Sequence, residues 1–168
     1  ACFTGLAPFT SLHTMPMDIA ALRHQFRAAK SELLTQFQHS RPTSSSASLF
    51  LKRLAQLVDD TLTTLWQAHA LPPDAALVAV GGYGRAELFP HSDVDLLILV
   101  PDAPHAVPGR AIEAFVGACW DVGLQIGHCV RAPDACLQEA AGDIPVATGV
   151  LERRLLAGSR RLFADVKA

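Results

Sequence analysis

The stretch that decides the fold runs Val80-Gly81-Gly82-Tyr83-Gly84-Arg85-Ala86-Glu87-Leu88-Phe89-Pro90-His91-Ser92-Asp93-Val94-Asp95-Leu96-Leu97-Ile98-Leu99. Residues 76–80 predict a short apolar strand, and the glycines that follow predict a loop. Residues 93–100 predict a second strand, apolar on both faces after its carboxylates, so we expect it to be central and covered on both sides. Because side chains alternate along a strand, Asp93 and Asp95 should point to the same face where this strand begins.

Two converging carboxylates predict a metal site. Like charges repel unless a cation lies between them, and hard oxygen ligands favour Mg²⁺ or Mn²⁺ over zinc. The glycines add the second half of the prediction, because Gly81, Gly82 and Gly84 lack Cβ and let backbone N–H groups approach an anion closely. A triphosphate on one side and Mg²⁺ on the other would make a nucleotide site.

The combination of these motifs is far more specific than either motif alone. An apolar strand, Gly-Gly, ten intervening residues and Asp-apolar-Asp-apolar resembles the signature of the DNA polymerase β-like nucleotidyltransferase superfamily. Residues 81–97 are similar, more narrowly, to the nucleotidyltransferase domain of the bifunctional uridylyltransferase/uridylyl-removing enzymes, as are residues 120–131 and 146–156. The resemblance extends over residues 50–163.

The resemblance implies an α/β (α+β) fold, a small mixed sheet of the polymerase β-like type flanked by N-terminal and C-terminal helices. We expect residues 1–16 to be a flexible arm or an expression remnant, residues 17–70 to be helical, and residues 71–168 to hold the core and C-terminal helices, all in one compact unit. Helical spacing of apolar residues begins after Asp18, a predicted N-cap, and continues to Phe37. The other expected elements are a loop 39–48, helix 50–66, loop 101–109, helix 111–121, strand 124–130, helix 133–141, helix 144–156 ended by a glycine, and a last helix from Ser159.

Nucleotidyl transfer suggests a role for each polar residue of the stretch. Asp93 and Asp95 are the expected metal ligands and catalytic groups. Four further residues are expected to bind the nucleotide: Gly81, Gly82, Arg85 and Ser92. Arg85 would neutralise phosphate charge, although a surface pair with Glu87 explains it equally well, and Ser92 would cap the loop or touch phosphate.

A third carboxylate is usual in the superfamily, on a later strand. Here the aligned position is Gly127, which cannot be a ligand, so Asp121 just before that strand is the expected substitute, with a helix-end role as the alternative. Glu87 and Asp102 are weaker candidates. Relatives are expected to have an acidic or basic residue at position 125. This chain has Gln125 instead, and the difference removes no predicted metal ligand.

The resemblance implies a donor, UTP, and an acceptor, a tyrosine hydroxyl of the nitrogen-regulatory protein PII, with pyrophosphate released. The HD phosphohydrolase and ACT domains of the family enzymes are expected to be absent from this chain, as in a fragment of a longer enzyme. Two alternatives stay open: another small nucleotidyltransferase that adenylylates a small molecule or protein, and a degenerate nucleotide-binding regulatory module. No residue pattern reveals which base is selected.

The composition and charge of the chain limit the kinds of partner that we expect. The chain has 168 residues, half of them apolar, which suits one globular domain. A net charge of −2 provides no basic field for nucleic acid, and no apolar run has the length of a membrane span. The four cysteines have no zinc-ligand spacing and are predicted to be reduced thiols, so we expect a cytoplasmic location.

Overall fold

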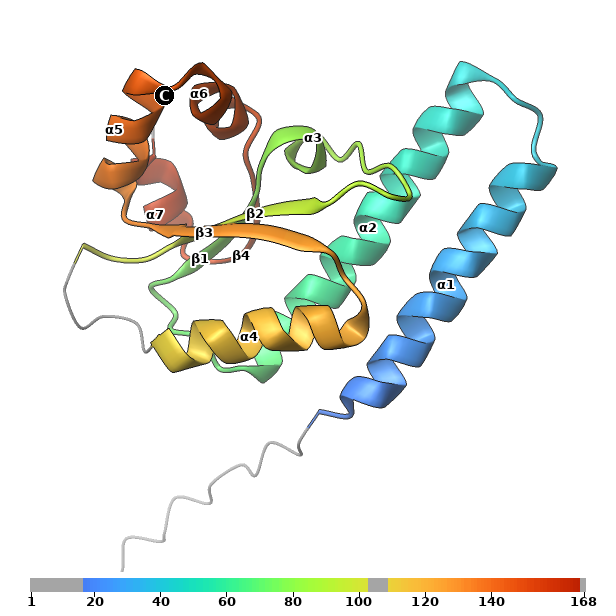
Figure 1. Cartoon of the computed structure of the whole chain (residues 1–168), viewed down its shortest axis with the longest axis horizontal. Coiled ribbons are helices and arrows are strands. Elements are labelled where there is room, and N and C mark those ends of the chain that lie inside the picture. The colour runs from blue at the N-terminus through green and yellow to red at the C-terminus, as the bar shows by residue number, and fades with distance from the viewer. Residues whose placement is uncertain (1–16, 103–108, 167–168) are drawn as a thin grey trace, which may run out of the picture.

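The computed structural model describes residues 17–102 and 109–166, so the predicted arm 1–16 and most of the predicted loop 101–109 lie outside it. A four-stranded sheet is covered by helices on both faces (Figure 1). In chain order the elements are α1 (Ile19–His39), α2 (Ser44–Ala68), β1 (Ala76–Ala79), α3 (Gly81–Gly84), β2 (Val94–Leu99), α4 (Gly109–Val122), β3 (Ile126–Arg131), α5 (Pro133–Gly142), α6 (Ile144–Leu151), β4 (Arg154–Gly158) and α7 (Arg160–Asp165).

The first two helices lie side by side as a hairpin (Figure 1). The Asp18 side chain caps α1 by accepting a hydrogen bond of 3.0 Å from the Ala21 N–H, as predicted. The predicted loop 39–48 was too long, because Thr43 and Ser46 form a capping box that starts α2 at Ser44. None of the described helices is long and apolar enough to cross a membrane.

The sheet has the order β3-β2-β1-β4 and is mixed, as the resemblance implied. Strand β1 is antiparallel to β2 and β4, whereas β2 and β3 are parallel. Strand β2 is central, as predicted. Its Leu96 and Ile98 enter the core beneath α2 and α4, while Leu97 and Leu99 enter a second core with residues of α5, α6 and α7.

The predicted helix 144–156 was wrong in its second half. Helix α6 ends at Leu151, and residues 154–158 form β4 instead. The physical reason is that β1 is fully buried, so the backbone groups on both of its edges need hydrogen-bond partners. Strand β2 pairs with one edge, and residues 154–158 pair with the other. Gly158 allows β4 to end against β1, since a Cβ there would lie 2.1 Å from the Ala75 carbonyl oxygen, and its φ is +87°.

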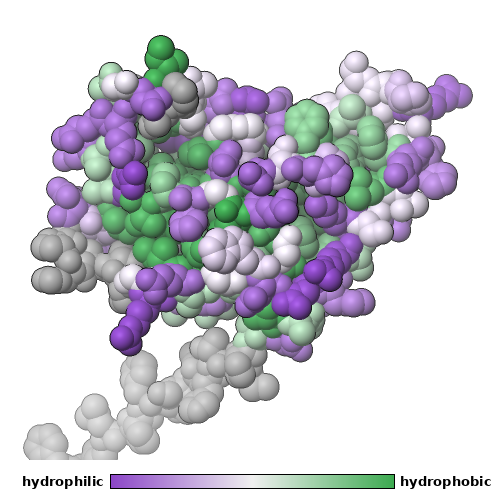
Figure 2. All heavy atoms as spheres, viewed as in Figure 1, coloured by the Kyte–Doolittle hydropathy of each residue, from purple (hydrophilic) through white to green (hydrophobic). Residues whose placement is uncertain are grey.

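On the face seen in Figure 2, the largest group of hydrophobic residues lies left of the centre, and hydrophilic residues lie across the centre and at the edges. This is the face on which β3 runs from α4 to α5 (Figure 1). Strand β3 is an edge strand, and its Gly127, His128 and Cys129 are exposed.

Candidate active site

The glycine stretch forms one helical turn, α3, rather than the predicted loop. The turn closes when the Gly84 N–H donates to the Val80 carbonyl over 3.0 Å. Gly81 has φ +59°, which favours glycine, and a Cβ there would lie 3.7 Å from Oδ2 of Asp95. The Val80 N–H donates to the backbone carbonyl of Asp95 over 3.1 Å, so the turn and this carboxylate are held next to each other.

Asp93 and Asp95 lie at the start of β2, and by strand alternation they share the face of Leu97. Burial, and then the charge of Asp93, raise the pKa of the Asp95 carboxyl above its usual value. Within residues 17–102 and 109–166, neither side chain has a hydrogen-bond or ion-pair partner. An unneutralised pair of carboxylates, with oxygen the only donor, fits a hard divalent cation such as Mg²⁺ or Mn²⁺.

Strand β3 brings Gly127 and Gln125 to the same face. Gly127 pairs in register with Asp95, and a Cβ at Gly127 would lie 2.9 Å from Oδ1 of that carboxylate. The Val94 N–H donates to the Gln125 carbonyl over 2.8 Å, and continuing the parallel register places Gln125 beside Asp93. Gln125 therefore occupies the position from which a third ligand would reach the pair. We predicted Asp121 for this position, although alternation along residues 124–130 was sufficient to place Gln125 on the same face as Gly127.

Asp121 is not brought to the carboxylate pair. It lies in the last turn of α4, which packs on the other face of the sheet, and its backbone carbonyl accepts a hydrogen bond from the Arg23 side chain. Asp102 lies in a separate hollow beside Asp134 and Arg161. Among the described residues, no group of three His, Cys, Asp or Glu side chains could hold a metal ion.

Arg85 and Ser92 have other surroundings than those expected of phosphate ligands. The Arg85 Nε lies 3.0 Å from Glu87, which confirms the surface pair, and its Nη1 lies 2.5 Å from Glu152. Ser92 is exposed and lines a hollow on the side of α1, together with Lys30. The Arg85 Nη2 lies 3.7 Å from where a Cβ on Gly82 would be, so Arg85 lies next to the glycine turn as well as in its two ion pairs.

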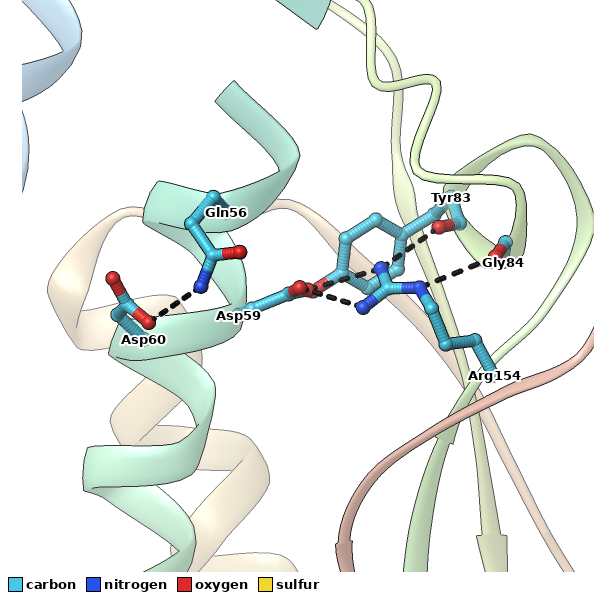
Figure 3. A network of polar contacts seen from close by, with 6 residues as sticks. All are labelled: Gln56, Asp59, Asp60, Tyr83, Gly84 and Arg154. Atoms are coloured by element: carbon cyan, nitrogen blue, oxygen red, sulfur yellow. Dashed lines mark hydrogen bonds and ion pairs between the residues drawn. The ribbon is translucent and has the colours of Figure 1, made fainter. Parts of the chain in front are cut away.

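A network of hydrogen bonds and an ion pair connects α3 to α2 and β4 (Figure 3). The Tyr83 hydroxyl donates to Asp59 over 2.5 Å, and Arg154 donates to both carboxylate oxygens of Asp59 at 2.6 and 3.1 Å. Arg154 also donates to the carbonyls of Tyr83 and Gly84, each at 3.2 Å. Burial and the Asp59 carboxylate raise the pKa of Tyr83, so the phenol stays neutral and remains a donor. The network joins α2, α3 and β4, and nothing in the sequence spacing predicted it.

We expect Arg154→Met to lower the free energy of unfolding by about 2 kcal/mol, because the poorly accessible Asp59 carboxylate would lose its charged partner. Arg154→Lys should recover part of this loss, since it keeps the charge but not the two-pronged geometry. Urea unfolding of the three proteins measures both effects. Equal stability of the Met variant and the parent would show that the network does not stabilise the fold.

The fold and the site together define a class. A mixed sheet, a glycine-rich turn after its first strand and two carboxylates opening the next strand are features of a nucleotidyltransferase domain, and the sequence profile of the "Nucleotidyltransferase domain" family matches residues 58–131. Residues 58–131 thus belong to a nucleotidyltransferase domain, and the glycine turn and both carboxylates lie within this segment.

The relatives narrow this class. The chain is 50% identical over 148 residues to the bifunctional uridylyltransferase/uridylyl-removing enzyme of Bordetella parapertussis, which is 88% of this chain and 16% of that protein. It is 45% identical over 165 residues to the enzyme of the same name in Cupriavidus pinatubonensis, covering 94% of this chain and 18% of the relative. The enzyme of that name in Chromobacterium violaceum is 48% identical over 144 residues, covering 86% of this chain and 17% of the relative. These matches confirm the resemblance found in the motifs, and the chain spans less than a fifth of the length of these relatives.

Proposed function

We propose that this chain transfers UMP from UTP to a tyrosine hydroxyl of PII and releases pyrophosphate. The observation that supports this most is the unneutralised Asp93 and Asp95 pair beside the α3 turn. The pair lies in a domain 50% identical to part of an enzyme named as a uridylyltransferase.

The reaction forms a bond between the tyrosine oxygen and the α-phosphorus, and breaks the bond from that phosphorus to the oxygen that bridges the α- and β-phosphates, which leaves as part of pyrophosphate. The hydroxyl proton is released. Bound Mg²⁺ or Mn²⁺ ions would stabilise charge on the attacking and leaving oxygens. Asp93 and Asp95 would hold them, while the backbone of Gly81 and Gly82 would lie against the phosphates. The network behind α3 keeps this backbone in place before substrate arrives.

The test is to incubate the purified chain with PII, Mg²⁺ and each of the four nucleoside triphosphates, and to record the intact mass of PII. We expect a gain of one UMP with UTP alone, and no gain when the metal is chelated. A gain of AMP with ATP would indicate a different nucleotidyltransferase and would contradict the proposed donor.

A nucleotide-binding module without turnover is the second candidate. One observation favours it. The residues beside the carboxylate pair on β3, where a third acidic group is expected, are Gly127 and Gln125, and neither is acidic. Metal-dependent UTP binding without any modification of PII, in the experiment above, would support this candidate over the first.

Gln125→Glu tests the position beside Asp93. A third negative charge beside Asp93 should lower the dissociation constant of Mn²⁺ about tenfold, since a close pair of opposite charges contributes roughly 1 kcal/mol or more. Without metal the same variant should melt at a lower temperature, because three carboxylates repel more than two. Titration of Mn²⁺ followed by electron paramagnetic resonance measures the first effect, with Gln125→Ala as the control that adds no charge. An unchanged affinity in Gln125→Glu would place residue 125 outside the metal site.

A further inference from the structure

A hollow of about 440 Å³ opens beside the carboxylate pair. Gly81 and Asp95 line one end of it, and the walls come from β3, α5 and α6. Its walls include the thiol side chains Cys129 and Cys136 and the apolar side chain of Val150. These walls carry no net charge, unlike the end that holds Asp95.

An ion pair lines the far end of the hollow. Arg131, in the last position of β3, donates from Nε to Glu139 of α5 over 2.9 Å. Arg131 and Gly127 lie four residues apart on the same face of the strand, which is about 13 Å at the usual rise. That length fits a nucleoside attached to an α-phosphate at the Asp95 end.

The two ends differ in chemistry in the way a nucleotide does. The carboxylates and glycines suit a metal-bound phosphate, and the neutral walls suit a ribose and a flat base. Arg131 has only donors and Glu139, when ionised, only acceptors. The uracil ring presents carbonyl acceptors on either side of an N3–H donor, so a carbonyl can accept from Arg131 while N3–H donates to Glu139. Cytosine has an acceptor at N3, which would face the Glu139 carboxylate unfavourably.

We propose that this hollow binds the nucleoside of the donor nucleotide, and that the Arg131 and Glu139 pair selects uracil over cytosine. The assignment rests on the proposed function for its donor, and goes beyond it by naming the residues that distinguish the base. A site that hydrogen-bonds a specific edge disfavours the analogue that leaves its polar groups unpaired, and because the Arg131 and Glu139 side chains are 39% and 49% exposed, we expect a preference for uracil and not an exclusion of cytosine.

Cys129 provides a direct probe of occupancy. It lies midway between Gly127 and Arg131 and lines the hollow. Cys129 is exposed, but partial desolvation by the surrounding residues raises the pKa of its thiol, so alkylation with N-ethylmaleimide is best followed at mildly alkaline pH. We expect UTP with Mg²⁺ to slow alkylation of Cys129 at least tenfold, as measured by peptide mass. Inorganic triphosphate with Mg²⁺, which can fill only the phosphate end, should leave the rate unchanged.

Glu139→Gln tests base selection. Equilibrium binding of UTP and CTP, each with Mg²⁺, should show a preference for UTP in the parent chain that falls at least fivefold in Glu139→Gln. Glu113→Gln is the matched control, because Glu113 is an exposed residue of α4 on the opposite side of the sheet. It should keep the preference of the parent.

The outcomes separate the two proposals. UTP binding that leaves Cys129 as reactive as in the free chain would overturn the nucleoside site, while UMP transfer to PII could still occur. An unchanged preference in Glu139→Gln would overturn the selection of uracil by this pair. Failure of the chain to bind any nucleotide with Mg²⁺ would overturn the proposed function, and the nucleoside site with it.

Discussion

Asp95→Asn should lower nucleotidyl transfer by about a hundredfold or more, because a bound cation contributes several kcal/mol to stabilising charge in the transition state. Asparagine keeps the size of the side chain but loses the negative charge that would hold the cation. The rate of PII modification measures the loss, and Mn²⁺ titration should show weaker binding in the same variant. Asp60→Asn is the control, since Asp60 is exposed on α2 and its carboxylate accepts a hydrogen bond from Gln56 of the same helix.

The same substitution should not destabilise the metal-free chain. The pKa of Asp95 is raised in the folded state by burial and by Asp93, so the folded protein holds this proton more tightly than the unfolded chain does. Stability from this group is therefore fully present below the unfolded pKa, and is lost as the pH rises through the raised folded value. Asparagine does not ionise. The melting temperature of Asp95→Asn should consequently match that of the parent in acid and exceed it near neutral pH.

Two results would contradict this account of Asp95. One is a variant that binds Mn²⁺ and transfers UMP as the parent does. The other is a variant that melts below the parent near neutral pH, which would show that the carboxylate has a stabilising partner in the fold.

Gly84→Ala should lower the free energy of unfolding by roughly 3 kcal/mol, near the upper end of the cost of forcing extra volume into a packed site. A Cβ at Gly84 would lie 2.0 Å from the Glu152 carbonyl oxygen and 3.2 Å from that of Ala79. Both obstacles are backbone atoms, so α3 and the connection from α6 to β4 would have to separate. Urea unfolding measures the loss, and the Tyr83 and Arg154 contacts should weaken with it.

Gly117→Ala is the matched control, and we expect the opposite sign. A Cβ at Gly117 would meet nothing within 4 Å, and alanine in a helix interior is favoured over glycine by about 0.5 to 1 kcal/mol. The two substitutions add the same methyl group. If both variants gained stability, the close approach of α3 to residue 152 would be refuted.

Local patterns in the sequence predicted much of the frame. The cap at Asp18, the short strand β1, the central strand β2 and Pro133 in the first turn of α5 each depend on neighbouring residues, and all were predicted. Strand β4 was not, because its apolar part, residues 155–157, is too short for its periodicity to distinguish the end of a helix from a strand. Only pairing with β1 decides between them.

In the candidate site, too, neighbouring residues predicted some positions, while others depend on contacts between distant parts of the chain. Alternation along one strand was sufficient to place Asp93 and Asp95 on one face. The position of Gln125 needed the register of a second strand, and the contact of Asp59 with Arg154 spans 95 residues. The expected third carboxylate, Asp121, is next to β3 in the chain but belongs to a helix on the far side of the sheet.

The Asp59, Tyr83 and Arg154 network also bears on the order in which the protein can mature during synthesis. A ribosome releases the glycine turn long before residue 154, and until that arginine emerges, Asp59 and the α3 carbonyls lack their cation. The nascent chain can therefore assemble α1, α2 and the first two strands early, while the α3 turn is locked only when β4 is added beside β1. A polypeptide that ended with the segment 58–131 matched by the family profile would lack this final step. Competence to bind a nucleotide would thus be conferred by the last strand of the domain, although none of the proposed ligands belongs to it.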